Sequence, residues 1–142
     1  MATADRFEDL RCWQTARRLT NLVYQHSEEG AFANDFGLKD QIQRAGVSIM
    51  SNIAEGVNSR TTGRFIDYLG RARGSATEVQ AQLYVALDRE YIRQKQFETA
   101  YDCADKVSRQ IYRFTDYLQS SSGNDGVHEP GVSYEVTDSH VR

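Results

Sequence analysis

The sequence predicts an all-α protein, an antiparallel four-helix bundle with up-down-up-down topology. Apolar residues recur every three or four positions through four long segments, which is the pattern of helices with one buried face. The only proline is Pro130, so residues 1–129 contain no helix breaker of that kind. Asp125-Gly126 is the only tight-hairpin signal of the Asn-Gly or Asp-Gly type. Four helices with short connections fold most simply as such a bundle.

The first helix is predicted over residues 6–28. We expect Asp5 to be its N-cap, and Glu8, three residues later, would complete a capping box. A loop over residues 31–37 follows, in which Phe32 and Phe36 are expected to plug the end of the bundle. The apolar positions of the first helix are Phe7, Leu10, Trp13, Ala16, Leu19 and Val23.

The second helix is predicted from Leu38 to Glu55. We expect Gly56 just past its end, because glycine adopts a left-handed conformation at little cost. Thr61 or Thr62 would then cap the third helix. In the third and fourth helices the apolar steps alternate between four and three residues, a heptad pattern suited to bundle packing. The predicted core of the last three helices is Leu38, Ile42, Ala45, Ile49 and Ile53; Phe65, Leu69, Ala72, Ala76, Val79, Leu83 and Ala86; and Phe97, Ala100, Ala104, Val107, Ile111, Phe114 and Leu118.

The composition changes after Gln119, which divides the chain into a bundle at 1–119 and a tail at 120–142. The tail is rich in serine and glycine, lacks a helical period and is predicted to be disordered. It carries four acidic residues against one arginine and so accounts for the whole net charge of −3. Of the chain's 20 acidic and 17 basic residues, 16 of each therefore remain in the bundle, and 13 of those bases are arginine.

The bundle contains no set of residues typical of catalysis or metal binding. His26 is its only histidine, and no Glu-x-x-His pair occurs of the kind that holds two metal ions in helical bundles. Cys12 and Cys103 fit small buried hydrophobic residues. We therefore expect no enzyme activity, no metal, no cofactor and no small-molecule substrate. Without an apolar signal region or a run long enough to span a membrane, the default expectation is a cytoplasmic protein.

The arginines indicate a binding surface. Arginine presents a planar fork that matches phosphate, so a neutral body rich in arginine can still bind anions locally. The alternative is a set of solvated arginines that pair with Asp67 and with acidic residues of neighbouring helices, and it remains open. The predicted nucleic-acid-binding strip consists of Arg60, Arg64, Arg71 and Arg73, with Arg17 and Arg18 as contributors.

The second and third helices can be aligned by counting back from the turn near Arg60. Residue 44 then lies level with residue 76, and Ser48 falls opposite Ala72. We predict a partly buried ion pair between Arg44 and Glu78, which would fix the register of the two helices.

Gly46, Gly70 and Gly74 lie inside helical patterns, where each costs about 1 kcal/mol relative to alanine. Close approach of another helix would offset that cost. The approaching helix would belong either to the same chain or to a neighbouring subunit.

Three stretches carry a resemblance to a known family: FEDLRCWQTA at 7–16, GL followed by QIQRAGVSIMSNIAEG within 37–56, and RFIDYLGRARGSATEVQAQL at 64–83. They resemble the bacterial four-helix-bundle proteins related to those encoded in 23S rRNA intervening sequences. The resemblance implies an up-down bundle that assembles as a ring, a homopentamer, with no known enzymatic activity. The accessory variability determinant of diversity-generating retroelements looks like the same fold, and it binds nucleic acid and partners a reverse transcriptase. The residues that we assign to helix and subunit packing on this basis are Arg44, Ser48, Asn52, Glu55, Gly74, Ser75 and Glu78.

The leading hypothesis is therefore a non-enzymatic, ring-forming scaffold that binds RNA or DNA through arginine strips. The second hypothesis is a protein–protein adaptor without nucleic-acid binding, such as an accessory subunit for a reverse transcriptase or another partner. An enzyme ranks last, because the bundle offers no base, nucleophile or metal set.

Overall fold

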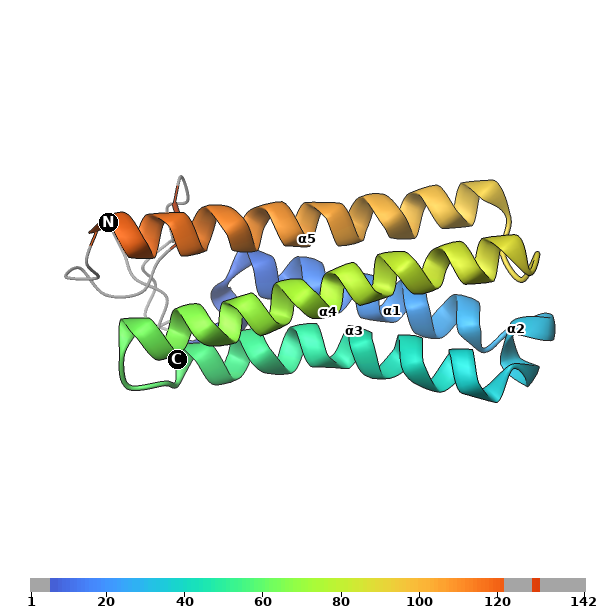
Figure 1. Cartoon of the computed structure of the whole chain (residues 1–142), viewed down its shortest axis with the longest axis horizontal. Helices are drawn as coiled ribbons and strands as arrows, with labels where there is room; N and C mark the ends of the chain where they lie inside the picture. Colours follow the sequence, from blue (N-terminus) through green and yellow to red (C-terminus); the bar gives the residue numbers. More distant parts are fainter. Residues whose placement is uncertain (1–5, 122–128, 131–142) are drawn as a thin grey trace.

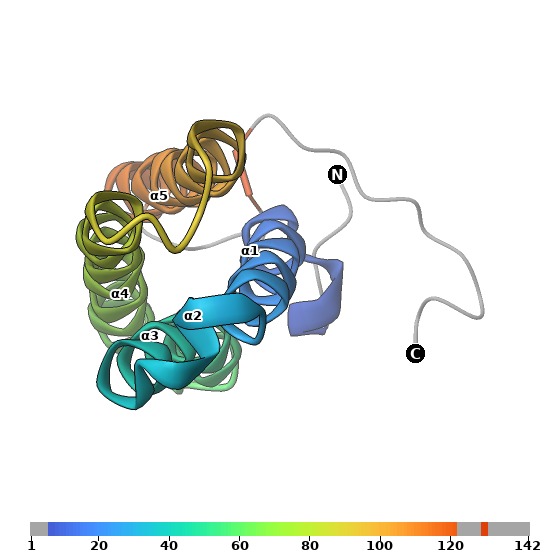
Figure 2. The same cartoon turned by 90° about the vertical axis from the view of Figure 1, so that its right-hand side faces the viewer.

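A computed structural model of the chain describes residues 6–121 together with Glu129 and Pro130. Four long helices lie side by side along one axis, and Figure 2 shows them at the corners of a square (Figure 1). Each helix packs on its two neighbours: α3 on α4, α4 on α5, and α1 on both α3 and α5. The predicted antiparallel four-helix bundle is confirmed. In chain order the elements are η1 (Phe7–Asp9), α1 (Arg11–Ser27), α2 (Gly30–Asn34), α3 (Phe36–Val57), α4 (Thr62–Asp88) and α5 (Gln94–Ser121).

The core is formed by the predicted apolar stripes. Every core position predicted in the second, third and fourth helical segments is buried. In the first segment Leu10, Ala16, Leu19 and Val23 are buried, whereas Phe7 and Trp13 are only partly buried. Two aromatic residues from different helices, Phe65 of α4 and Phe114 of α5, meet edge to face with ring centroids 5.3 Å apart. The three-and-four spacing therefore identified the buried face of each helix correctly.

The start of the first helix differs from the prediction. A single turn of 3-10 helix occupies residues 7–9, and α1 begins only at Arg11, because Leu10 adopts an extended conformation and no side chain of its own segment caps the helix. The side chain of Leu10 is fully buried, so the extended residue between the two helices places an apolar side chain in the core. The proposed N-cap, Asp5, lies outside the described residues.

The connection between α1 and α3 contains a short helix, α2, where a loop was predicted. Phe32 in α2 is buried and stacks on Tyr91 with ring centroids 5.4 Å apart, so it plugs the bundle end as expected. The same role for Phe36 was wrong: its side chain is 75% exposed. Asp35 caps α3 by accepting a hydrogen bond from the Leu38 N–H at 3.1 Å, and it also accepts one from the Tyr91 hydroxyl at 2.9 Å.

The helix ends around the second connection also need correction. Gly56 was expected beyond the helix, but α3 continues through it to Val57 without a left-handed residue there. Its role is steric, because a Cβ at position 56 would lie 2.7 Å from Cδ1 of Phe65. The following helix, α4, is capped by Thr61, whose hydroxyl accepts a hydrogen bond from the Arg64 N–H at 3.1 Å.

The mid-helix glycines fall into two groups. Gly46 lets α1 approach α3: its Cβ would lie 3.2 Å from Oγ1 of Thr20, and that hydroxyl donates a hydrogen bond to the Gly46 carbonyl at 3.0 Å. Gly70 and Gly74 of α4 have open space where a Cβ would stand. Close approach within the chain therefore explains Gly46 and not the two glycines of α4.

The C-terminal region begins slightly later than predicted, since α5 runs to Ser121. Most of the predicted disordered tail lies outside the described residues. Glu129 is described and is buried, with 3% exposure. None of the helices in the described ranges is long and apolar enough to cross a membrane.

Candidate nucleic-acid interface

The four arginines of the predicted strip are exposed, but they do not form one surface. Arg60 lies in the α3–α4 connection, and Arg64 and Arg71 lie two turns apart on one side of α4. Between them stands Tyr68, whose ring centroid is 5.0 Å from Cζ of Arg71. Arg73 turns to the other side of α4, towards α5. The strip is thus divided between two flanks of α4.

The first surface, here called the α3–α4 basic surface, surrounds the connection between these two helices. It encloses a hollow of about 350 Å³. The guanidinium groups of Arg60 and Arg64 line it together with a carboxylate, that of Glu55. This carboxylate lowers the local attraction for anions. The lining residues are Glu55, Asn58, Ser59, Arg60, Arg64 and Tyr68.

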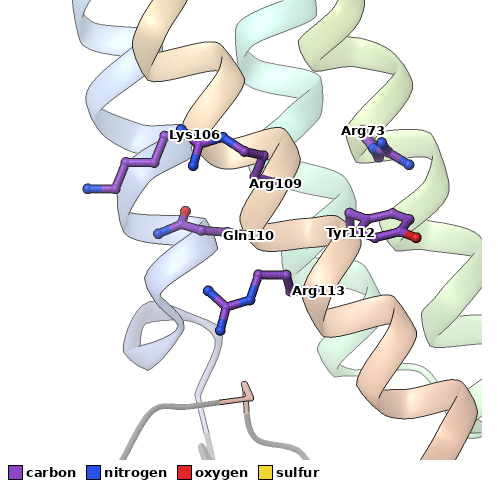
Figure 3. A pocket seen from close by; sticks show the side chains of 6 residues that line it. All are labelled: Arg73, Lys106, Arg109, Gln110, Tyr112 and Arg113. Atoms are coloured by element: carbon purple, nitrogen blue, oxygen red, sulfur yellow. The ribbon is translucent and has the colours of Figure 1, made fainter.

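The second surface, here called the α4–α5 basic pocket, has a volume of about 460 Å³. Four of its lining side chains are cationic and none is acidic, so it is the more favourable site for an anion. In Figure 3, Arg73 and Tyr112 lie between α4 and α5, and the remaining side chains project from the other side of α5. The lining residues are Arg73, Lys106, Arg109, Gln110, Tyr112 and Arg113.

Two contacts hold Arg73 in this pocket. Its Nε donates a hydrogen bond to the Ser108 hydroxyl at 3.2 Å, and its Cζ lies 4.8 Å from the centroid of the Tyr112 ring. Arg109 is paired with Asp105, one turn earlier on α5, with Nε and Oδ2 2.9 Å apart. This pair is exposed, so water screens it and Arg109 stays available to an incoming phosphate.

Sequence reasoning missed the three cations of α5. Lys106, Arg109 and Arg113 follow one another at spacings of three and four residues, which places them on one face of a helix. That face lies opposite the predicted core positions of the same segment. The spacing of these three cations is therefore a signal in the sequence from which this face could have been predicted.

The contributors predicted on the first helix do not join either surface. Arg17 and Arg18 are exposed on α1 and line neither hollow. Cζ of Arg17 lies 5.9 Å from the Trp13 ring centroid, a cation–π contact that holds this side chain on its own helix.

Few of the arginines are neutralised by ion pairs. Within residues 6–121, 129 and 130, three pairs occur: Arg6–Glu8, Arg44–Asp40 and Arg109–Asp105. The alternative of arginines occupied by carboxylates therefore does not describe Arg60, Arg64, Arg71 or Arg73.

The predicted ion pair between Arg44 and Glu78 was wrong. Nε of Arg44 lies 2.9 Å from Oδ2 of Asp40, one turn earlier on α3, and both side chains are largely exposed. Glu78 is exposed on α4 and makes no ion pair with any described residue. Both members of the predicted pair lie on the outer side of their helices, where the partner on the same helix is within easier reach.

A hydrogen-bonded group of small polar residues joins α3 to α4 instead. The Ser75 hydroxyl donates to the Ser48 hydroxyl oxygen at 2.9 Å across the two helices. Nδ2 of Asn52 donates to the carbonyl of Ser48 at 2.9 Å and to its hydroxyl at 3.0 Å. Glu55 and Gly74, assigned to packing on the same grounds, are exposed.

The residues with chemical reactivity are shielded. Cys12 and Cys103 are free thiols with 0% and 4% exposure, and burial next to the Glu129 carboxylate raises the pKa of the Cys12 thiol well above its ordinary value. Burial lowers the pKa of His26, and neither of its ring nitrogens has a hydrogen-bond partner. In the described part of the chain, no group of three or more His, Cys, Asp or Glu side chains could hold a metal ion.

Fold and surface together define a small antiparallel helical bundle with exposed basic hollows along its helices. The chain belongs to the 23S rRNA-intervening sequence protein family, whose model matches residues 8–113. A similar solved structure is that of a protein with unknown function from the S23 ribosomal protein family of Bacteroides thetaiotaomicron VPI-5482. It is 22% identical, has a TM-score of 0.68, and the match covers 74% of this chain and 95% of that one. At this identity the likeness shows the fold alone. No curated protein matches the chain.

Proposed function

We propose that this protein is a non-enzymatic scaffold that binds RNA or DNA through the α4–α5 basic pocket. The carrying observation is the pocket itself: Arg73, Lys106, Arg109 and Arg113 line it without a carboxylate. Phosphate oxygens are the natural partners of such a group, because guanidinium donors bind them in pairs and the released counterions favour association. The family's name refers to 23S rRNA, which makes RNA the first ligand to test.

The test is binding of purified protein to labelled structured RNA and duplex DNA across a salt series. The affinity should fall steeply as salt rises, and the slope should count the phosphates neutralised, at about 0.9 per contact on B-DNA. The variant K106Q/R109Q/R113Q should lower the slope on duplex DNA by roughly two to three. Its control removes the same charge elsewhere on the exposed surface, at Arg44, Arg89 and Lys95.

An unchanged slope in the triple variant would reject this pocket as the binding site. The comparison variant R60Q/R64Q/R71Q then tests the α3–α4 basic surface in the same assay. Absence of binding to both ligands, even at low salt, would reject the nucleic-acid function.

We propose as well that the subunits assemble as a ring, as the resemblance implies, through the outer face of α4. Gly70 and Gly74 support this, because their open Cβ positions would let a helix of a second subunit approach closely. The variant G70M/G74M places two long side chains on this face, at positions where a Cβ meets no atom of the same chain within 4 Å. The variant should form a smaller assembly than the wild type in native mass spectrometry, while its helix content stays unchanged. A ring of unchanged size would reject this face as the contact.

The second candidate is a protein adaptor. An aromatic cluster with one exposed member favours it: Tyr84 is 50% exposed, and its ring centroid lies 4.9 Å from that of the buried Phe97 and 5.7 Å from that of Tyr101. Tyrosine at an exposed position is typical of interface anchors. A partner captured by the wild type but lost by Tyr84→Ala, from a protein that binds no nucleic acid, would favour this function.

A further inference from the structure

One aromatic side chain stands among the cations of the α4–α5 basic pocket. Tyr112 is 54% exposed, although a tyrosine of this size in a bundle normally buries its ring. The guanidinium group of Arg73 covers one face of the ring, with Cζ 4.8 Å from the centroid. In the described part of the chain no other aromatic ring stacks on Tyr112. One face of the ring is therefore covered by the Arg73 guanidinium group, and the exposed part of the ring can accept a second planar group.

This arrangement holds the ring in place before any ligand arrives. Arg73 is itself held by a hydrogen bond that its Nε donates to the Ser108 hydroxyl of α5 at 3.2 Å. More than half of Tyr112 is exposed, so a planar group can approach its ring from the solvent side. The pocket volume of about 460 Å³ lies within the ordinary range for sites that hold small ligands.

Cations alone do not distinguish single-stranded from duplex nucleic acid, since both present phosphates. An exposed aromatic ring distinguishes the two, because it can stack only on a base that is not already stacked between neighbouring bases. In a duplex every base is paired and stacked, and only edges and backbone are accessible. A tyrosine set among three arginines and one lysine is thus the pattern of a surface that binds single strands.

The distances along α5 fit a short stretch of strand. Lys106 and Arg113 are seven residues apart, which is roughly 10 Å along a helix at 1.5 Å per residue. This is about the length of three stacked nucleotides at 3.4 Å each. Tyr112 precedes Arg113 by one position but projects from the opposite side of α5 (Figure 3), so a strand with one base on its ring would cross α5 to bring a phosphate to Arg113.

We propose that the α4–α5 basic pocket binds a single-stranded polynucleotide, with phosphates on Lys106, Arg109 and Arg113 and one base stacked on the exposed ring of Tyr112. The proposal rests on the proposed function and makes it specific. It assigns to Tyr112 the preference for single strands and to the cations the salt dependence. RNA and DNA share the stacking chemistry, and their comparison tests whether the 2′-hydroxyl contributes.

The test uses a fluorescein-labelled ten-nucleotide single-stranded RNA, the DNA of the same sequence, and the two corresponding duplexes. Tyr112→Ala should weaken single-strand binding about tenfold and leave duplex binding within about twofold of the wild type. Tyr112→Phe keeps the ring and should retain the wild-type affinity. Tyr24→Ala, which removes an exposed tyrosine of α1 outside the pocket, is the matched control and should change neither. Circular dichroism checks that each variant is folded.

The outcomes separate this inference from the function on which it rests. If Tyr112→Ala binds single strands as tightly as the wild type, while K106Q/R109Q/R113Q still lowers the salt slope, base stacking is refuted and the phosphate function stands. Base stacking is refuted as well if Tyr112→Ala weakens single strands and duplexes equally, because the ring would then act only by holding Arg73. If no probe binds at low salt, both proposals fail together.

Discussion

The carboxylate of Glu129 caps the helix that begins at Arg11, although 118 residues separate the two in the chain. It accepts hydrogen bonds from the backbone N–H of Arg11 and, at 2.9 Å, from that of Cys12. The first N–H groups of a helix lack partners within the helix, and α1 has no capping side chain of its own. A residue from beyond the last helix therefore completes the first one and links the two ends of the described chain.

This link predicts a stability loss when Glu129 is changed. Glu129→Ala should lower the free energy of unfolding by about 1–2 kcal/mol, because it removes a charged cap from one buried and one part-buried donor. A chain truncated after Ser121 should lose a similar amount in urea titration. The control is Glu78→Ala, which removes an exposed carboxylate without an ion pair among the described residues. A truncated chain as stable as the full chain would refute the cap.

The glycines predict opposite effects of the same substitution at two positions. Gly56→Ala would place a Cβ 2.7 Å from the Phe65 ring, so the buried ring or the helices must shift, and stability should fall by about 1–3 kcal/mol. Gly63→Ala, in the first turn of α4, meets no atom within 4 Å. It should raise stability by up to about 1 kcal/mol, because alanine loses less backbone entropy on folding. Thermal unfolding measures the change in stability of both variants. Equal changes would contradict the steric role of Gly56.

The contact between α3 and α4 predicts which pairs are energetically coupled. In a double-mutant cycle, Ser48→Ala and Ser75→Ala should show a coupling of about 0.5–1.5 kcal/mol, the usual range for one hydrogen bond. Arg44→Ala and Glu78→Ala should show none, since Arg44 pairs with Asp40 and no ion pair joins it to Glu78. Urea unfolding of the wild type, the single variants and the two double variants measures both couplings. A coupling at Arg44 and Glu78 comparable with that of the serines would contradict this assignment of the interface.

The sequence predicted the helices and their buried faces, but it misplaced the register of α3 against α4. Counting Cα positions from the turn placed Ser48 opposite Ala72, whereas its hydroxyl meets that of Ser75. Helical side chains lean towards the N-terminus of their own helix by about one position. In an antiparallel pair the two leanings add, so residues that touch have higher numbers than residues that lie level. Part of the three-residue difference has this geometrical origin.

The candidate nucleic-acid interface could be predicted only in part, because the side of a helix to which a residue turns depends on packing. Arg60, Arg64, Arg71 and Arg73 are all exposed as expected, but the side of α4 to which each turns depends on the neighbouring helices. Arg73 meets α5, so its pocket is completed by cations 33 to 40 residues later in the chain. The contact between Glu129 and α1 also joins residues that are far apart in the sequence, so no local sequence pattern predicts it. Local periodicity predicts faces, whereas sites depend on packing.

The last prediction concerns pH and His26, which is buried near the end of α1 with neither ring nitrogen hydrogen-bonded. Burial is the main cause that lowers its pKa below the ordinary 6.5; Arg93 acts in the same direction and Glu29 opposes it. The unfolded chain therefore takes up a proton on His26 at a higher pH than the folded chain does. This residue does not reduce stability above pH 6.5, and stability should fall as the pH drops below that value.

His26→Gln removes the titration, so its free energy of unfolding should fall less than that of the wild type between pH 7.5 and 5.5. The carboxylates that do not interact with His26 contribute alike to both proteins and cancel in this comparison. Identical losses in the two proteins would show that His26 has the same pKa in the folded and unfolded states.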